Sequence, residues 1–590
     1  MKIQKLKVSN WRSIKEIEVK AQDLMVIIGQ NNHGKSNLIS ALLFFFGEIK
    51  VQDLDFNSGA RELFVEIEFS GLDDADKRTF KKYLTSSHGI VVRKSAYLGG
   101  SFDYRGYIEK PEEEWLQEAN ASAYTSRELA VSLPFHPFIP ASGRISKQDI
   151  IDAQCLYISQ NKDTIQFSFE QETTNFMGLK SVAKGIFGEV YFIPAVKEAS
   201  DDFSSKDSSV FGKLYADVVS AMSESNQDWK ETKCKLENLF STLNKLDAQG
   251  NINDSRPQQL IDFEDELTTE LSAWGVQLDI EVSPPDIESV FRANTQVWVH
   301  DGVRTDIQRK GHGLQRALTV ALVQVVSKKS LSNVDEGYEE TSFRQSSKSR
   351  YFFFEEPELY LHPQAQRSLF DSFVSLSESG SQVILCTHSS GLIDVERYKS
   401  IYIVTKANEA IGSKIKQCSE DIFEGDRKKD FNLSYWINPD RGELFFASKV
   451  VLLEGATDKT VIPLLAKSLG VFRYDYTLID CGSKDNIPLY ARLLNKFKIP
   501  YMAVYDKDHQ PHKNPDAITS ADISTKLIEN EINSDIGASI ILENDIEEEL
   551  GLPQGNKNKP YGALTHISSP DFVISDSFKS KIFKIYDVEV

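Results

Sequence analysis

The chain has 590 residues, a formal net charge of −20, and 41% hydrophobic against 26% charged residues. Its length exceeds what a single core usually holds, so two to four domains are expected, and its charge excludes nucleic-acid binding by bulk attraction without local basic patches or divalent metal. Five scattered cysteines and the lack of an apolar run of membrane-spanning length argue against a disulfide framework, a zinc ribbon and a membrane protein, and suit the cytoplasm.

The strongest local signal lies between residues 24 and 46. Residues 24–28 are typical of a buried strand, residues 29–36 match GxxxxGK[ST], and residues 37–46 are typical of a helix. Glycines let backbone N–H groups curl around phosphate oxygens, and the helix N-terminus adds the positive end of its dipole. We therefore expect Lys35 to reach the outer phosphates of ATP and the Ser36 hydroxyl to bind Mg²⁺. The other nucleotide-binding candidates in this loop are Gly29, Asn32 and Gly34.

Residues 201–251 predict a helical insertion, because their apolar residues recur at helical spacing. Two interpretations stay open: a dimerisation element, or a helical hairpin packed on its own head. The serine-rich, charged residues 327–350 predict a surface loop. The apolar positions of the insertion include Leu214, Val218, Val219, Met222, Leu236, Leu239 and Phe240.

An acidic partner for the phosphate-binding loop follows the apolar run at residues 351–354. Glu355 would hold the Mg²⁺ ion, and Glu356 would orient and polarise the attacking water. A third apolar strand in "QVILCTHSSGLI" leads to His388, which would lie close to the γ-phosphate. These elements predict an ATPase whose motifs are far apart in the sequence.

From residue 444 onward, apolar strands alternate with helices, which predicts a small parallel α/β sheet with its active site at the carboxyl ends of the strands. Glu454, Asp506 and Asp508 follow such strands. Taken alone, the DxD of Asp506 and Asp508 also suits a polar turn. Together, the three carboxylates predict a Mg²⁺ or Mn²⁺ site, since hard cations prefer oxygen ligands and offset the repulsion between the acids.

The first half of the chain resembles a known family. "RKGHGLQRALTVALVQ" (309–324) is similar to the signature motif of ABC-type ATPases in the variant form of SMC-like proteins, and with "EEPE" (355–358), "LHP" (361–363) and His388 it resembles the ATPase half of the OLD (overcoming lysogenization defect) family. In such proteins two heads sandwich ATP. The resemblance implies that His388 is the switch histidine, and Glu355 stands where the family usually has Asp. It also implies nucleotide contacts in trans from Gly311, Gly313 and Gln315, and a nucleotide-proximal position for Arg12.

The second half resembles the Toprim domain of OLD nucleases. Glu454, Gly455 and Asp458 match its first acidic motif, with Asp458 where OLD proteins often carry Glu, and the DxD at 506–508 matches its second. The resemblance implies that Glu543 and Glu547 bind a second metal and that Lys559 is a cation near the scissile phosphate. The acidic run 543–549 also suits a solvated helix face. A local basic group is expected beside the site: Arg492, Lys496 and Lys498.

The expected fold is α/β: an ABC-type P-loop ATPase head with a helical insertion, followed by a Toprim domain with a small parallel sheet. The boundaries follow from the motifs. We expect the P-loop segment of the ATPase at 1–195, the insertion at 196–275, the signature segment of the ATPase at 276–405, a connector at 406–443 and the Toprim domain at 444–590.

The expected function is that of an ATP-hydrolysing, Mg²⁺- or Mn²⁺-dependent nuclease. The resemblance implies that it is a DNA endonuclease that nicks or cleaves DNA in defence against phage. Because the P-loop and the signature must come from different heads, we expect a homodimer or a higher oligomer. The alternative is an SMC-like ATPase that acts as a DNA-binding sensor, with its Toprim domain as a scaffold. The family resemblance also allows a helicase-like partner or a retron reverse transcriptase with its DNA, and the residues do not choose between these. A topoisomerase or primase is disfavoured because no zinc ribbon is recognisable.

Overall fold

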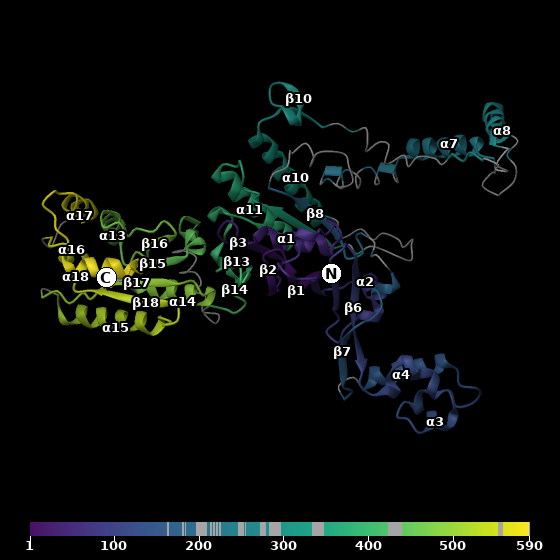
Figure 1. The fold of residues 1–590 in the computed structure, drawn as a ribbon, viewed down its shortest axis with the longest axis horizontal. Helices are drawn as coiled ribbons and strands as arrows, with labels where there is room; N and C mark the ends of the chain where they lie inside the picture. Colours follow the sequence, from purple (N-terminus) through teal and green to yellow (C-terminus); the bar gives the residue numbers. More distant parts are fainter. Residues whose placement is uncertain are drawn as a thin grey trace. The chain divides into compact units, whose positions relative to one another are not determined.

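A computed structural model gives the fold of the chain (Figure 1). The chain divides into two compact units: residues 1–190, 336–358 and 366–590 form the first, and residues 191–335 and 359–365 form the second. The structure describes all residues except 162–163, 180–181, 183, 196–208, 210, 213–214, 216–218, 220–221, 224–225, 246–252, 254, 272–278, 283–294, 296, 333–346, 348, 423–438, 512, 553–558 and 589–590.

The N-terminal region of the first unit contains an antiparallel sheet with the order β2-β1-β4-β5-β6-β7. In β4 buried apolar residues alternate with partly exposed residues, which gives the sheet one face toward the core. The strands are β1 (Lys2–Trp11), β2 (Ile14–Lys20), β4 (Glu62–Ser70), β5 (Ile90–Tyr97), β6 (Phe102–Pro111) and β7 (Phe167–Gln171). Short helices accompany this sheet: α2 (Asp74–Thr79), α3 (Arg127–Val131) and α4 (Lys147–Gln160).

Helix α1 (Lys35–Phe45) is held by this antiparallel sheet at its middle and at its C-terminal end. The Trp11 indole donates a hydrogen bond to the Ser40 hydroxyl at 2.9 Å, and its ring lies 5.2 Å from that of Phe44. At the C-terminal end of the helix, the Lys94 amine donates to the Phe44 carbonyl and the Tyr104 hydroxyl donates to the Phe45 carbonyl. These donors satisfy carbonyls that the last turn of a helix leaves unpaired.

The second sheet has the order β14-β13-β3-β12-β11-β8, and its central strands are parallel. Strands β3 and β12 are buried at every position, as expected for strands covered on both faces. Because β12 lies between β3 and β11, the carboxyl ends of all three strands meet at one edge. The strands are β3 (Leu24–Ile28), β8 (Glu189–Ile193), β11 (Arg350–Glu355), β12 (Gln382–Cys386), β13 (Ile401–Lys406) and β14 (Ser413–Gln417); α11 (Pro363–Glu378) connects β11 to β12.

Strand β14 lies inside the segment expected as an irregular connector. It pairs antiparallel with β13 at the edge of the sheet. Its sequence, SKIKQ, has only one apolar residue, so it lacks the apolar run that identifies a buried strand. The expectation of an irregular connector is therefore wrong for residues 413–417, and residues 423–438 of the same segment lie outside the described residues.

The small parallel sheet expected near the C-terminus is confirmed, with the order β16-β15-β17-β18. One face packs against α13, α17 and α18, and α14 and α15 contact each other elsewhere in the domain (Figure 1). The strands are β15 (Lys449–Leu453), β16 (Tyr476–Asp480), β17 (Tyr501–Asp506) and β18 (Gly537–Leu542). The helices are α13 (Ala456–Ser468), α14 (Ile487–Phe497), α15 (Pro515–Glu531), α16 (Ile546–Glu549), α17 (Lys559–Ile567) and α18 (Asp576–Ile585).

The second unit contains the helical insertion and the signature segment. Its described elements are α7 (Gln227–Leu243), α8 (Gln258–Leu271), the hairpin β9 (Trp298–His300) and β10 (Arg304–Asp306), the turn η8 (Ile307–Arg309) and α10 (His312–Ser332). A buried ion pair between Arg256 and Glu264, with 2.6 Å between Nη1 and Oε2, orders the region of α7 and α8. Of the expected apolar positions, Leu214 and Val218 lie outside the described residues, whereas Leu239 is exposed. The dimerisation role of this insertion stays a prediction.

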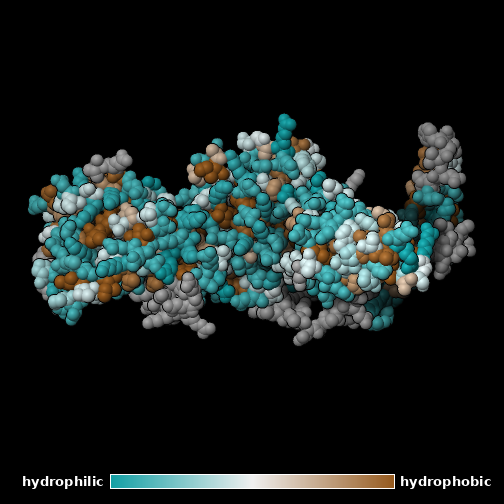
Figure 2. Space-filling model, turned by 90° about the horizontal axis from the view of Figure 1, so that it is seen from below, coloured by the Kyte–Doolittle hydropathy of each residue, from teal (hydrophilic) through white to brown (hydrophobic). Residues whose placement is uncertain are grey.

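No helix in the described regions is long and apolar enough to cross a membrane. On the face shown in Figure 2, hydrophilic residues predominate and hydrophobic residues form separate groups.

Replacing Trp11 tests how strongly the antiparallel sheet holds α1. Trp11→Ala removes a fully buried ring and the hydrogen bond to Ser40, so we expect it to destabilise the ATPase region by about 3–5 kcal/mol. Urea unfolding, followed by circular dichroism, measures the free energy of unfolding from the transition of the ATPase region. The matched control is Val573→Ala, whose side chain is 86% exposed. An equal effect of the two substitutions would contradict the packing described for α1.

Candidate functional site

The loop between β3 and α1 has a backbone that only glycine fits at two positions. Gly29 has φ +146°, and a Cβ there would lie 2.3 Å from the carbonyl oxygen of Val404. Gly34, which precedes α1, has φ +101°, and a Cβ would lie 2.6 Å from the Ser13 hydroxyl. Asn32 also has a positive φ, of 63°. The loop therefore packs closely against β13 and Ser13, with a backbone that leaves no room for a side chain at these two glycines, as a phosphate cradle requires.

Lys35 is buried inside this loop. Its Nζ donates to the carbonyl oxygens of Gly29 and Gln30, both at 3.0 Å. Burial lowers the pKa of the Lys35 amine, and the charges of Glu356 and Glu358 oppose that shift. The amine is therefore held at the mouth of the cradle near carboxylates on the neighbouring strand.

Glu355 and Glu356 lie at the carboxyl end of β11. Burial raises the pKa of Glu355, and a hydrogen bond with the Ser36 hydroxyl opposes the rise. Glu356 has φ +43°, and its N–H donates to the Cys386 carbonyl at 2.8 Å, which fixes this strained turn against β12. The structure therefore brings the Mg²⁺ ligands expected on Ser36 and Glu355 together.

His388 lies next to Glu356, with 3.5 Å between its Nε2 and Oε1 of the carboxylate. Burial lowers the pKa of the imidazole, and the charge of Lys35 lowers it further. The backbone N–H of His388 donates at 2.7 Å to Oε1 of Glu358, whose Oε2 is buried without a hydrogen-bond partner among the described residues. Glu358 is thus a positioning residue that sequence reasoning did not select, although it belongs to the quoted acidic motif.

Arg12 lies beside the first turn of α1. Its Nε donates to Asp55 at 2.8 Å, and its Nη1 lies 3.4 Å from Oδ1 of Asn37. Its charge also acts to lower the pKa of Glu355, against the larger effect of burial. This places Arg12 beside the first turn of α1, while its position next to the nucleotide stays a prediction.

The signature residues belong to the other compact unit. Gly311 and Gly313 are exposed around the start of α10. Gln315 is buried, and its Nε2 donates to the carbonyls of Ile307 and Lys310 at 3.0 and 2.8 Å. The side-chain N–H groups of Gln315 therefore brace the turn before α10, while nucleotide contact in trans stays a prediction for all three residues.

The carboxyl edge of the C-terminal sheet gathers acidic side chains. Glu454 follows β15 and accepts a hydrogen bond at 3.2 Å from the backbone N–H of Asp506, the last residue of β17. Burial, together with the charges of Glu454 and then Asp458 and Asp508, raises the pKa of Asp506 to about 9. Burial also raises the pKa of Glu454. Oδ1 of Asp506 is buried without a hydrogen-bond partner among the described residues.

Asp458 and Glu547 extend this acidic group. Asp458 is buried in the first turn of α13 and accepts from the Gly455 N–H at 3.0 Å. Burial raises its pKa to about 7; the charges of Glu454 and Glu547 contribute, against the opposing effect of the Gly455 hydrogen bond. Glu547 is buried as well, in α16. Helix α16 therefore turns at least one acid of the run 543–549 inward, which the solvated-face interpretation did not expect.

Two other expected residues are less well placed. The side chain of Glu543 is exposed, and the structure does not bring it into the acidic group. The backbone of Lys559 begins α17, but its side chain lies outside what the structure describes.

The prediction of a basic group beside this site is wrong. Arg492 pairs with Glu531, and Lys496 pairs with Glu420 at 2.7 Å. Both lie on α14, which leads into β17, so they extend toward the amino end of that strand and away from its acidic carboxyl end. A helix that precedes a parallel strand must end at that opposite edge.

The cations that do accompany the acids are Lys484 and Lys513. Lys484 is buried after β16; its Nζ donates to the Asp506 carbonyl at 2.5 Å and lies 3.9 Å from Oδ2 of Asp508. Lys513 forms an ion pair with Oδ1 of Asp508. Sequence reasoning missed both lysines and also Asp545, whose charge acts on Asp506. The available signal was that Lys484 follows a strand of the same sheet.

The acids at this edge are suitable ligands for a divalent cation, although protons and lysine amines offset their charges in this structure. Among the described residues, no three His, Cys, Asp or Glu side chains already surround one metal-sized position. However, Asp506 and Asp458 each have a buried carboxylate oxygen with no hydrogen-bond partner in the described regions. Oxygen ligands of this kind are what Mg²⁺ and Mn²⁺ bind. A cation would replace the bound protons and compete with Lys513 for Asp508.

The two sites define a P-loop ATPase joined to a Toprim-type metal domain. Residues 1–393 match the family model described as "AAA ATPase domain", and residues 445–508 match the model described as "Overcoming lysogenization defect protein-like, TOPRIM domain". The chain therefore belongs to the family of proteins with this AAA ATPase domain and carries an OLD-like TOPRIM domain after it, which confirms the resemblance and the fold class expected from the sequence.

Individual relatives cover the chain to different extents. The Old nuclease of Escherichia phage P2 is 23% identical over 605 aligned positions, which cover 97% of this chain and 87% of that protein. The OLD nuclease of Thermus scotoductus is 27% identical over 37% of this chain and 44% of its own length. The endonuclease GajA of Bacillus cereus is 25% identical over 29% of this chain and 28% of its own length. Among solved structures, an SMC head bound to the C-terminal winged-helix domain of ScpA has a TM-score of 0.34 at 14% identity, covering 70% of this chain and 97% of that one.

The raised pKa of Asp506 predicts a pH-dependent stability of the metal-free protein. The folded carboxyl keeps its proton up to about pH 9, whereas an unfolded Asp releases it near pH ~3.9. Between these values the folded chain binds more protons, so its stability falls as the pH rises. Thermal melting in EDTA should therefore show a falling melting temperature, and Asp506→Asn should flatten the fall.

Added Mg²⁺ should raise the melting temperature more at pH 8 than at pH 6, because at the higher pH fewer protons have to be displaced.

The matched control for the pH dependence in EDTA is Asp571→Asn, which changes an exposed carboxylate. Its melting temperature should fall with pH as steeply as that of the unmodified protein. The same slope in Asp506→Asn would contradict the assignment of the buried proton to this group.

Proposed function

We propose that this protein is an ATP-hydrolysing, divalent-metal-dependent DNA endonuclease. The observation that carries the proposal is the buried group of carboxyls around Asp506, whose raised pKa values mark a position built for positive charge. The names of the relatives, two OLD nucleases and an endonuclease, support the same activity. A role in defence against phage, implied by the family resemblance, belongs to the proposal.

In the ATPase region, the tight loop would bind the phosphates of ATP through its backbone N–H groups. Lys35 would hold the outer phosphates, and Ser36 with Glu355 would hold a Mg²⁺ ion. Glu356 would orient the attacking water, while His388, fixed by Glu358 through its backbone, would lie against the γ-phosphate. Arg12 would add positive charge beside the phosphates.

In the Toprim domain, Glu454, Asp506 and Asp508 would hold one Mg²⁺ or Mn²⁺ ion, and Asp458 and Glu547 would support a second. Bound ions of this kind lower the pKa of a water and stabilise the leaving oxygen of a phosphodiester. The chain itself would supply the rigid edge of four parallel strands that fixes these ligands. Lys484 would keep the backbone at Asp506 in place, and Lys559 would be a cation near the phosphate.

The ATP site would be completed by a second copy of the chain. In that arrangement Gly311 and Gly313, exposed at the start of α10, would contact the nucleotide held by the partner's loop. The N-terminus of a helix suits this contact, because its free N–H groups bind anions. The active species would then be a dimer or a higher oligomer through the heads.

Substitutions in the ATPase region test the first half of the proposal. Lys35→Ala should abolish ATP binding, because it removes the cation fixed at the loop. Glu356→Gln should still bind ATP but hydrolyse it about 10²-fold more slowly, since the water loses its carboxylate. With ATP, Glu356→Gln should also accumulate as a dimer in light scattering. Glu409→Gln, at an exposed turn, is the control and should behave as the unmodified protein.

Hydrolysis by Glu356→Gln at the unmodified rate would show that another group activates the water. A Glu356→Gln protein that stays monomeric with ATP bound would contradict the shared site.

Substitution of Asp508 separates the two activities. Asp508→Asn and Asp508→Ala should abolish nicking of supercoiled plasmid in Mg²⁺ or Mn²⁺, because a lost carboxylate removes a metal ligand and its fixed geometry. ATP hydrolysis by the same preparations should stay nearly unchanged, since Lys35 and Glu356 lie at the edge of a different sheet, in the first turn of α1 and directly after β11. Asp516→Asn, an exposed Asp in the first turn of α15, serves as the control. If both Asp508 variants nick at the unmodified rate, the Toprim domain is a scaffold and the protein acts as an ATPase sensor.

A further inference from the structure

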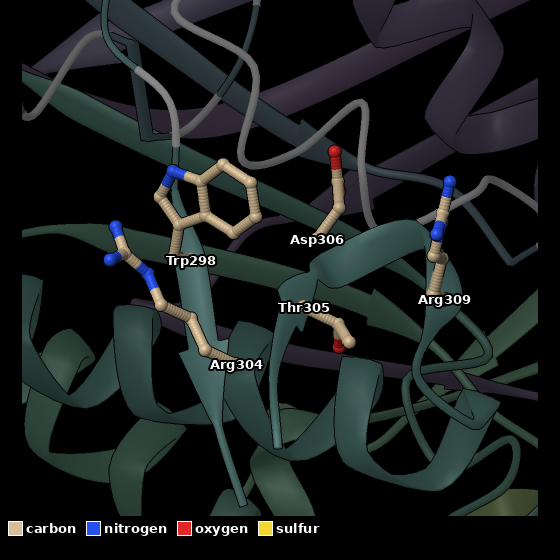
Figure 3. A pocket seen from close by; sticks show the side chains of 5 residues that line it. All are labelled: Trp298, Arg304, Thr305, Asp306 and Arg309. Atoms are coloured by element: carbon tan, nitrogen blue, oxygen red, sulfur yellow. The ribbon is translucent and has the colours of Figure 1, made fainter.

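A pocket of about 310 Å³ lies beside the signature segment, and neither the ATPase site nor the Toprim site uses it (Figure 3). It is formed by the hairpin β9–β10 and the turn η8, all within the second compact unit. Its size is that of a small-ligand site. Its lining residues are Trp298, Arg304, Thr305, Asp306 and Arg309.

The pocket presents an exposed aromatic ring with a cation against it. Trp298 is 51% exposed, which is unusual for so large an apolar side chain. The guanidinium carbon of Arg304 lies 4.9 Å from the centroid of the Trp298 ring. Trp298 pairs with Asp306 across the hairpin, and in Figure 3 these two side chains and Arg309 project toward the same side. The ring is thus ordered by the hairpin and open to a ligand.

The charged groups of the pocket are two arginines and one aspartate. In Figure 3, Thr305 is directed away from the side on which Trp298, Asp306 and Arg309 project, so its side chain is not part of the surface proposed to meet a ligand. The charges of Arg304 and Arg309 exceed that of Asp306 by one positive unit, which suits an anion with a single charge.

The backbone of the hairpin is braced, and the Arg304 guanidinium is held against the Trp298 ring in advance of binding. Lys310 pairs with Asp301 at the hairpin turn and donates to the Val303 carbonyl at 3.0 Å. Gln315 ties η8 to α10 through the two hydrogen bonds described above. A rigid aromatic platform loses less entropy on stacking than a mobile one.

We propose that this pocket binds a base and its phosphate in single-stranded DNA. The base would stack on Trp298, as bases do on the aromatic side chains of single-strand-binding proteins, and Arg309 would contact the phosphate. One nucleotide of a strand carries one negative charge, which matches the single net positive charge of the pocket. A free nucleoside triphosphate carries more charge, and the chain already has a glycine-rich loop with Lys35 for it. Bases in a duplex are stacked on each other and are not available to Trp298.

This inference goes beyond the proposed function and does not require the nuclease to be active. Binding can be measured in EDTA without ATP, where neither cleavage nor hydrolysis occurs. A failure of the nuclease proposal and a failure of this one are therefore distinguishable.

The test is the fluorescence anisotropy of a short labelled oligothymidylate with the full chain. Trp298→Ala should weaken binding about 30-fold, the middle of the range for a lost base stack. Arg309→Gln should weaken it and reduce the slope of log affinity against log salt by about 0.7, the value for one single-strand phosphate contact. The matched controls are Tyr474→Ala, an aromatic residue that is 90% exposed on the Toprim domain, and Arg144→Gln, an exposed arginine. Both controls should bind as the unmodified chain.

Three results would overturn the proposal. The first is unchanged binding by Trp298→Ala with a melting curve like that of the unmodified chain. If Trp298→Ala melts at a lower temperature than the unmodified chain, the Arg309→Gln variant decides. The second result is then an unchanged affinity and salt slope in Arg309→Gln. The third uses the Lys35→Ala background: displacement of the oligonucleotide by ATP there would make the pocket a site for free nucleotide.

Discussion

The carboxyl groups buried at the ends of parallel strands are the constraint on which both sites depend. Parallel pairing brings the ends of β3, β11 and β12 to one edge and those of β15 and β17 to another. Acids at such an edge repel one another, and their burial adds a desolvation cost that only a proton or a cation can offset. The repulsion and the desolvation cost are offset by different groups at the two edges. At the first, Lys35 lies close enough to Glu356 and Glu358 for their charges to act on its pKa; at the second, protons on Asp506 and Asp458 and the amines of Lys484 and Lys513 share the task.

Much of this arrangement was predictable because short, continuous segments of the sequence determine it. An apolar run followed by an acid defines the edge of a parallel sheet, and the glycines of the loop are required by φ values and close contacts that no other residue tolerates. The residues that sequence reasoning missed give no periodic signal. Lys484, Lys513 and Asp545 lie in turns or at a helix N-cap; the fold brings Lys484 and Asp545 to Asp506, and Lys513 pairs with Asp508.

The errors have physical causes as well. The basic residues of α14 are near β17 in the sequence, but the direction of a parallel strand sends them to the opposite edge, where Glu531 and Glu420 neutralise two of them. Glu543 and Glu547 are one helical turn apart, yet they differ in burial because Asp545 caps α16 between them. Strand β14 was missed because an edge strand needs few apolar residues. The direction of the chain along β17 can be inferred from the sequence, whereas the residue at which α16 begins cannot.

The net charge of −20 acquires a local meaning from these sites. An acidic chain cannot hold a polyanion by its overall field, so each contact with DNA must bring its own compensation. In the function proposed above, that compensation at the Toprim edge is a metal ion taken up by acids that repel one another without it. In the proposal for the β9–β10 hairpin, it is stacking on Trp298, which needs no charge, with Arg309 for a single phosphate. Both proposed contacts are short in range and specific in geometry. On these proposals, DNA is held only at such sites, while the net negative charge opposes its binding elsewhere.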